Sequence, residues 1–228
     1  MDKRKNYYIV LDSETAPIDN TIQGVNPKNM LCYDIGFAVI DKKGNIYEKY
    51  SFIVKEIFFD NNLMKSAYYY NKIPQYLQDI IDCKRVVETF QNIEITLKTI
   101  FSKYSCKAIM AHNARFDYYA LQTTARYIYN NPNYYMFPFN FPFWDTLKMS
   151  RDVLKVRKSY INFCKENGFM TRHKTPRPQL KAETLYRFIT QDIDFIENHT
   201  GLEDVLIEKE IFAYCIKQHK KMRRNLFE

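Results

Sequence analysis

The chain has 228 residues, 46% of them hydrophobic and 26% charged, which is enough for one globular domain that buries its core without disulfide or metal staples. Its five cysteines include no C-x-x-C pair, and no apolar run reaches about 18 residues. We therefore expect neither a structural zinc site nor a membrane-spanning helix, and a cytoplasmic protein. The net charge of +8 favours a polyanionic partner such as nucleic acid.

Three strands are predicted in the first quarter of the chain. Tyr7–Leu11 is a continuous run of apolar, aromatic and β-branched residues, typical of a central strand that is buried on both faces. Leu31–Ile40 is the second strand, and the alternation in Ile46–Val54 indicates the third, after the polar turn Asp41–Asn45. Together they predict an antiparallel meander.

The middle of the chain is predicted to alternate between helices and strands. Lys55–Lys84 is irregular and rich in tyrosine, so we expect an insertion with short helices. Apolar residues at helical spacing then predict a helix over Val86–Tyr104. Ala108–Ala111 is a short buried strand, and Asn113 is expected to cap a helix that runs to about Tyr129.

The last part of the chain is predicted to be mostly helical after a final strand at Phe141–Thr146. A second insertion is expected at 155–178, and Thr200–Glu203 has the sequence of a capping box for the last helix. Strands followed by βα alternation and then helices predict the α/β class with a mixed sheet. We expect a single domain that spans residues 1–228.

Four carboxylates and one histidine are the candidates for chemistry. Asp12 and Glu14 are one residue apart at the end of the first strand, so their side chains point to the same face. Two such carboxylates repel each other unless a cation neutralises them, and Mg²⁺ prefers oxygen ligands. Asp117 lies in the first turn of a predicted helix, and His199 and Asp204 flank the start of the last helix. Each residue alone also has a structural explanation, such as an acid that stabilises a helix dipole.

Taken together, these residues follow the order D-x-E, H-N-A-x-F-D and H-x-x-x-x-D. This order resembles the DnaQ-like 3′→5′ exonucleases, in the subgroup with a histidine in the third motif. The resemblance covers roughly Tyr7 to Lys217. It departs from many relatives after Glu14, where Thr15-Ala16-Pro17 stands in place of a sequence such as Thr-Thr-Gly.

The resemblance implies a ribonuclease H-like fold with a five-stranded mixed sheet flanked by helices. It also implies stepwise hydrolysis of a nucleic acid from a free 3′ end to nucleoside monophosphates. Two divalent cations, Mg²⁺ or Mn²⁺, would be bound by Asp12, Glu14, Asp117 and Asp204. His199 would accept the proton of the attacking water, a role that suits its unperturbed pKa.

Two groups of residues are predicted to contact the substrate. The resemblance places four of them around the terminal nucleotide: Thr15, His112, Asn113 and Phe116. The other group comes from residues 146–181, which hold ten Lys and Arg against two acids. Within this segment Lys155, Arg157 and Lys158 are predicted to bind phosphates, and a solvated charged face is the alternative interpretation.

Several alternatives stay open at this point. Single-stranded DNA is the expected substrate. No residue can be tied to the 2′-hydroxyl of RNA, so an exoribonuclease that trims RNA 3′ ends is the second hypothesis. A non-catalytic nucleic-acid-binding module on the same fold is the third. We expect a standalone enzyme of a bacterium or a phage. A phage enzyme would act in the host cytoplasm. A homo-oligomer and a polymerase or replication partner are both compatible with the sequence.

Overall fold

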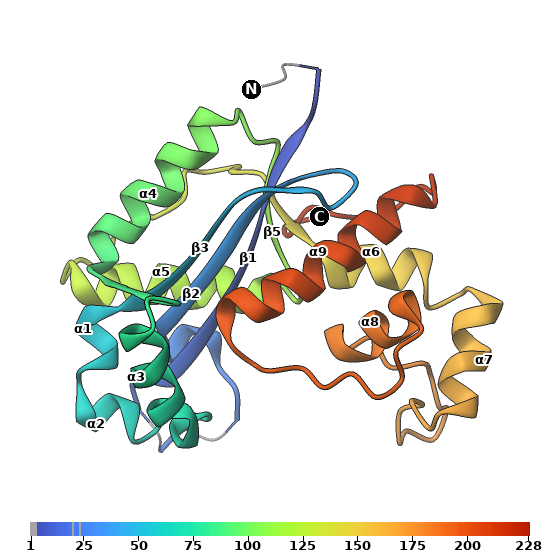
Figure 1. The fold of residues 1–228 in the computed structure, drawn as a ribbon, viewed down its shortest axis with the longest axis horizontal. Coiled ribbons are helices and arrows are strands. Elements are labelled where there is room, and N and C mark those ends of the chain that lie inside the picture. Colours follow the sequence, from blue (N-terminus) through green and yellow to red (C-terminus); the bar gives the residue numbers. More distant parts are fainter. Residues whose placement is uncertain (1–3, 20, 23) are drawn as a thin grey trace.

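The computed structural model describes residues 4–19, 21–22 and 24–228. Its centre is a mixed sheet in the order β4-β3-β2-β1-β5-β6, with β1 to β3 antiparallel and the other neighbours parallel (Figure 1). The strands are β1 (Tyr7–Pro17), β2 (Met30–Asp41), β3 (Ile46–Val54), β4 (Val86–Glu88), β5 (Ile109–Ala111) and β6 (Phe143–Asp145). The predicted mixed α/β sheet and its antiparallel meander are confirmed.

The sheet has six strands where five were predicted, because β4 was assigned to a helix. Val86 and Val87 pair in parallel with Phe52 and Ile53 of β3. The helix begins only at Phe90, after Thr89, whose hydroxyl accepts a hydrogen bond from the main-chain N–H of Asn92. Two successive β-branched residues favour the strand, and the threonine cap sets the start of the helix.

Helices cover both faces of the sheet (Figure 1). The α-helices are α1 (Lys55–Phe58), α2 (Asn61–Met64), α3 (Ile73–Ile81), α4 (Phe90–Lys103), α5 (Arg115–Ile128), α6 (Thr146–Val153), α7 (Lys158–Glu166), α8 (Ala182–Thr190) and α9 (Gly201–Lys217). Two 3₁₀ turns, η1 (Pro27–Asn29) and η2 (Tyr70–Lys72), accompany them. The predicted insertion at 55–84 therefore consists of short helices. No helix within the described residues is long and apolar enough to cross a membrane.

The alternation of side chains along β1 divides the core in two. Ile9 and Leu11 pack into a cluster with residues of α4 and α5. Tyr8 and Val10 pack on the opposite face, in a cluster with residues of α6, α7, α8 and α9. Since successive residues of a strand point to opposite faces, residues 12 and 14 face α9, whereas residue 13 faces α5.

Two predicted helix caps differ from the structure. Asn113 adopts a left-handed conformation with φ of 62°, and its main-chain N–H donates to Asp145 rather than its side chain capping α5. Thr200 is the N-cap of α9, but its hydroxyl donates to the Glu203 carboxylate at 2.5 Å and makes no bond to the helix backbone. A residue distant in sequence takes part in each place. Asp145 accepts the N–H of Asn113, and Arg85 donates to the Glu203 carboxylate that the Thr200 hydroxyl also contacts.

Candidate active site

Strand β1 carries Asp12 and Glu14 toward α9. The strand continues in regular pairing with β2 to Glu14, where a bulge separates Glu14 from Thr15. Both side chains therefore leave the same face of the sheet, as the D-x-E spacing predicts. Ser13, between them, faces the other way, and its N–H and hydroxyl donate to Asp117 of α5 at 3.1 and 2.8 Å. Asp117 is thereby held at the strand that carries the other two acids.

Helix α9 brings the fourth acid to this edge. Its first residue, Gly201, crosses β2 at Gly36 so closely that a Cβ on Gly36 would lie 2.2 Å from the Gly201 carbonyl carbon. Glycine at this crossing lets the helix approach the sheet. Asp204 then meets Asp12 and Glu14, and one carboxylate oxygen from each of the three lies within 4.8 Å of the others.

Burial and mutual repulsion change the proton affinity of these carboxylates. Burial is the main cause in each case and raises the pKa of Asp117 to about 7, of Asp204 to about 8 and of Glu14 to about 9. The pKa of Asp12 lies well above its usual range, because it is buried and faces Asp117 and Asp204. Clustered carboxylates of this kind take up protons or a cation.

The free oxygens in the cluster suit a hard divalent cation. Asp204 Oδ1 and Glu208 Oε2 are buried, and neither has a hydrogen-bond partner among the residues that the structure describes. A buried carboxylate oxygen without a partner is costly, and a cation would satisfy it. The donors at the strand edge are all oxygens, which Mg²⁺ and Mn²⁺ prefer over nitrogen or sulfur. The residues present therefore fit the predicted ions.

Glu208 is a site residue that the sequence analysis missed. It follows Asp204 by one helical turn, so both acids lie on the same face of α9. Its Oε1 accepts the main-chain N–H of His112 at 3.0 Å, and burial raises its pKa well above the usual range. The i, i+4 spacing from Asp204 was the available signal, but a glutamate at that spacing is common on solvated helices.

His199 lies in the loop before α9, as predicted, with φ of 49°. Its Nδ1 is 4.0 Å from Asp204 Oδ2 and 3.7 Å from Oε2 of Glu197, a second residue that was not predicted. Burial and the nearby Lys72 ammonium lower the pKa of His199 below its ordinary value, so its imidazole is neutral near pH 7. Burial and the neighbouring Glu183 raise the pKa of Glu197 to about 7.

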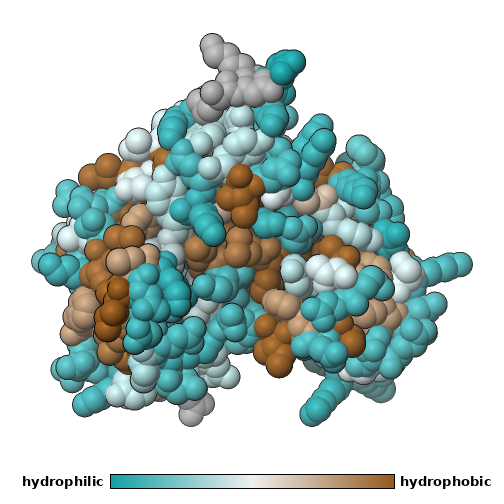
Figure 2. Space-filling model, in the orientation of Figure 1, coloured by the Kyte–Doolittle hydropathy of each residue, from teal (hydrophilic) through white to brown (hydrophobic). Residues whose placement is uncertain are grey.

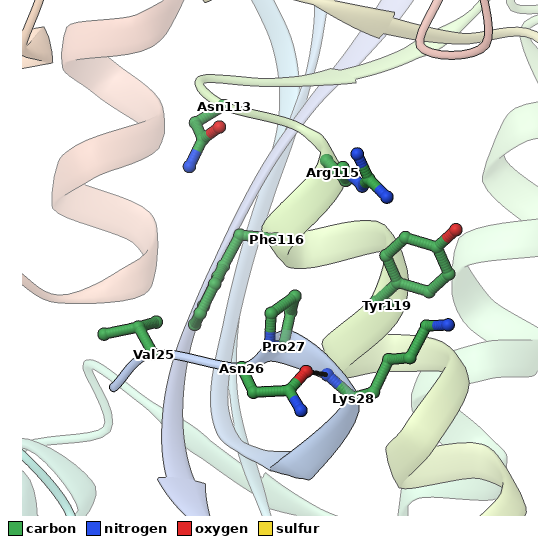
Figure 3. A pocket seen from close by; sticks show the side chains of 8 residues that line it. All are labelled: Val25, Asn26, Pro27, Lys28, Asn113, Arg115, Phe116 and Tyr119. Atoms are coloured by element: carbon green, nitrogen blue, oxygen red, sulfur yellow. Dashed lines mark hydrogen bonds between the residues drawn. The ribbon is translucent and has the colours of Figure 1, made fainter. Parts of the chain in front are cut away.

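The residues predicted around the terminal nucleotide occupy different environments. Asn113 and Phe116 line a hollow of about 440 Å³, in which Phe116 points toward the Val25–Lys28 loop (Figure 3). Thr15 follows the bulge after Glu14. The ring of His112 is engaged within the protein, with Nδ1 3.0 Å from Thr146 Oγ1 and Nε2 2.8 Å from the Leu180 carbonyl oxygen.

The three predicted phosphate-binding residues also separate. Lys155 lines a hollow of about 700 Å³ next to His112 and Asn113. Arg157 bonds instead to Tyr214 of α9 and to Gln218 just after that helix, at 2.5 and 2.8 Å. Lys158 is exposed at the start of α7 and does not line this hollow. Four further cationic or titratable side chains line its wall: Arg151, His173, Arg177 and Lys181.

On the face seen in Figure 2, the surface is mostly hydrophilic and is hollowed between the part over α3 and the part over α8. The loop from α8 to α9, which carries His199, runs across this region in the same view (Figure 1). It reaches the side of the sheet where the 55–84 insertion lies, and Lys72 of the insertion hydrogen-bonds the carbonyl oxygens of Asn198 and His199.

The known proteins to which the chain is similar include a DNA polymerase and exonuclease I. No protein-family profile matches the chain. The PolC-type DNA polymerase III of Thermotoga petrophila is 23% identical over 232 residues, which cover 97% of this chain and 15% of the polymerase. A zinc-bound E. coli ExoI–ssDNA complex matches with a TM-score of 0.62 at 15% identity, over 94% of this chain and 41% of that chain.

A product-bound exonuclease I gives a TM-score of 0.60 at 17% identity, over 94% of this chain and 44% of that chain. The chain thus spans less than half the length of these exonuclease I chains. At such identities the likeness establishes the fold, on which the predicted D-x-E pair and Asp204 converge at one sheet edge beside His199. The chain therefore shares the fold of one part of exonuclease I and resembles the DnaQ-like 3′→5′ exonucleases, as its three motifs predict.

Proposed function

We propose that the chain is a metal-dependent 3′→5′ exonuclease that releases nucleoside monophosphates from single-stranded DNA. The observation that carries the proposal is the meeting of Asp12, Glu14 and Asp204 within 4.8 Å, with His199 Nδ1 4.0 Å from Asp204 Oδ2. The similar exonuclease I structures, which include complexes with single-stranded DNA, support the choice of substrate.

In this proposal the four acids hold two divalent cations. Glu14 and Asp204 would hold one ion, Asp117 would hold the other, and Asp12 would be a ligand in the same cluster. When bound, the ions supply the Lewis acidity that activates a water and stabilises the leaving oxygen. Glu208, with a free buried oxygen next to the cluster, is a further candidate for the ligand set.

His199 acts as the general base in the same scheme. Its lowered pKa keeps a ring nitrogen free to accept the proton of the attacking water. Glu197 lies 3.7 Å from Nδ1 and would stabilise the imidazolium that results, as a carboxylate beside a catalytic histidine does in other hydrolases. Asn113 and Phe116 would border the terminal nucleotide in the hollow next to η1.

The proposal is tested by end-labelled substrates. With Mg²⁺ or Mn²⁺, a 3′-labelled single strand should release labelled mononucleotide at once, and a 5′-labelled strand should shorten stepwise. Ca²⁺ should support little turnover and excess EDTA none. Undiminished cleavage in chelator would rule out the metal mechanism. Faster degradation of RNA than of DNA would identify the exoribonuclease alternative, and binding without turnover would identify the non-catalytic module.

The basic hollow is proposed to bind the phosphates of the incoming strand. We expect the triple variant Arg151→Gln, Lys155→Gln and Arg177→Gln to bind all sequences more weakly and to the same degree. With fewer phosphate contacts, fewer counterions are released when the strand binds. The slope of log affinity against log salt should fall by about 0.7 per contact for a single strand, or about 2 in the triple variant. The rate at saturating substrate and low salt should change little, since no acid of the cluster is altered.

A control variant removes the same charge elsewhere. Lys42, Lys43 and Lys49 are exposed on the β2–β3 hairpin, and their replacement by Gln should leave the salt slope unchanged. Arg157 is left intact because its bonds to Tyr214 and Gln218 would make its loss a change in folding as well. Equal slopes for the hollow variant and the parent would show that these cations face water and that the strand follows another path.

A further inference from the structure

The 55–84 insertion contacts the proposed catalytic histidine directly. The ring of Tyr69 stacks on the ring of His199, with centroids 5.1 Å apart and an interplanar angle of 12°. Lys72, three residues further along, lies 4.6 Å above the Tyr69 ring. Its ammonium also donates to the main-chain carbonyl oxygens of Asn198 and His199, the latter at 3.1 Å. One short segment thus holds both the backbone and the ring of His199.

His199 has few other constraints on its orientation. It lies in a loop, its side chain is 43% exposed, and its φ of 49° is uncommon for a residue other than glycine. The two nearest carboxylates, of Glu197 and Asp204, are 3.7 and 4.0 Å from Nδ1, which is beyond hydrogen-bond distance. These carboxylates attract an imidazolium but do not fix the plane of a neutral ring. The stacked Tyr69 ring does fix the plane of the imidazole.

We propose that Tyr69 is a positioning residue that holds the imidazole plane of His199 toward the acidic cluster, while Lys72 holds the loop beneath it. The inference rests on the proposed role of His199 as the base. It assigns a function to the insertion, which carries none of the acids of the cluster and none of the residues predicted to contact the substrate. A flat ring is what the role requires, so the tyrosine hydroxyl should be dispensable.

The expected effects follow from the need for an aligned base. Tyr69→Leu should lower kcat by roughly 10- to 100-fold with little change in KM, because misplacement of a catalytic group costs on this order. Tyr69→Phe, which keeps the ring, should restore kcat to within about twofold of the parent. Tyr70→Leu is the matched control, since Tyr70 is adjacent and its side chain is about half exposed. It should leave kcat unchanged.

A double-mutant cycle separates this inference from the base assignment on which it rests. His199→Ala should lower kcat by roughly 10²–10⁴-fold, the usual contribution of a positioned base. In that background, Tyr69→Leu should have no further effect, because residues that act as one unit are not additive. If the two effects multiply instead, Tyr69 acts elsewhere and the inference is overturned. If His199→Ala alone has near-parental activity, the base assignment itself fails.

Melting temperatures of all variants are measured in the same buffer, so that a folding defect is recognised. Should Tyr69→Leu fail to fold, Lys72→Met replaces it in the cycle. That variant removes the two carbonyl bonds and keeps the Tyr69 ring. It should lower kcat in the parent and not in the His199→Ala background. An unchanged kcat in Lys72→Met, or an equal loss in both backgrounds, would contradict the inference.

Discussion

Asp12→Ala is expected to lower turnover by at least about 10³-fold, the order of loss when a group that stabilises the transition-state charge is removed. Asp12 is buried beside the other acids, and Asp117 and Asp204 are the neighbouring charges that most raise its pKa. Single-turnover cleavage of a labelled strand in saturating Mg²⁺ measures the loss. Asp192→Asn, an exposed acid outside the cluster, should have parental activity. Near-parental turnover in Asp12→Ala would remove Asp12 from the site.

The acidic cluster should also make the stability of the metal-free protein depend on pH. Because the folded-state pKa values of Asp204 and Glu14 are raised to about 8 and about 9, the folded protein binds more protons than the unfolded chain above the ordinary carboxyl range near pH 4. Without metal, stability should therefore fall as pH rises from about 4 toward 9, and added Mg²⁺ should restore it.

Asp12→Asn removes one charge from this cluster and should relieve part of the loss. At pH 8 in metal-free buffer, we expect its melting temperature to rise by at least about 2–4 °C, which corresponds to about 1 kcal/mol for a chain of this size. The difference from the parent should shrink toward pH 5, where the carboxyls are protonated. A large drop in melting temperature at pH 8 would mean that Asp12 has a structural role.

Arg85→Ala is expected to destabilise the protein by about 3–5 kcal/mol, because it leaves a buried charge without its partner. The guanidinium of Arg85 is 2% exposed and bonds Asp34, Asp79 and Glu203 at 3.1, 3.0 and 2.9 Å. Asp34 is fully buried and also accepts the main-chain N–H of Gly201 at 2.9 Å. Arg85 thereby connects β2, the end of the insertion and the start of α9, one residue before Asp204.

Urea unfolding of the metal-free protein measures the loss as a shift of the midpoint at constant slope. Lys84→Ala is the matched control, since Lys84 is adjacent and its side chain is 64% exposed. Its pairs with Asp79 and Asp82 should contribute less than about 1 kcal/mol. Arg85→Lys keeps the charge but not the planar fork, so it should fall between the two. A loss below about 1 kcal/mol in Arg85→Ala would mean that water replaces the guanidinium.

The sequence by itself determined the central strands and the common face of the two D-x-E carboxylates. Tyr7–Leu11 has too many large apolar residues for any place but a strand buried on both faces, and the structure places it at the centre of the sheet. The D-x-E spacing then decides that both carboxylates leave one face, because the side-chain period of a strand is two. These are local rules, so no knowledge of distant residues was needed.

The sequence could not decide which distant groups complete the site. Glu197, Glu208 and the Tyr69 ring have ordinary surroundings in the chain. They approach the acidic cluster and His199 only because α9 packs on β1 and β2 and residues 69–72 contact the loop before α9. The Arg85–Asp34 pair joins positions 51 residues apart, with no periodicity to predict it. Arg157, chosen for its charge, meets α9 instead of the hollow. Charge and spacing are properties of the chain, whereas desolvation and pairing depend on which surfaces the tertiary fold brings into contact.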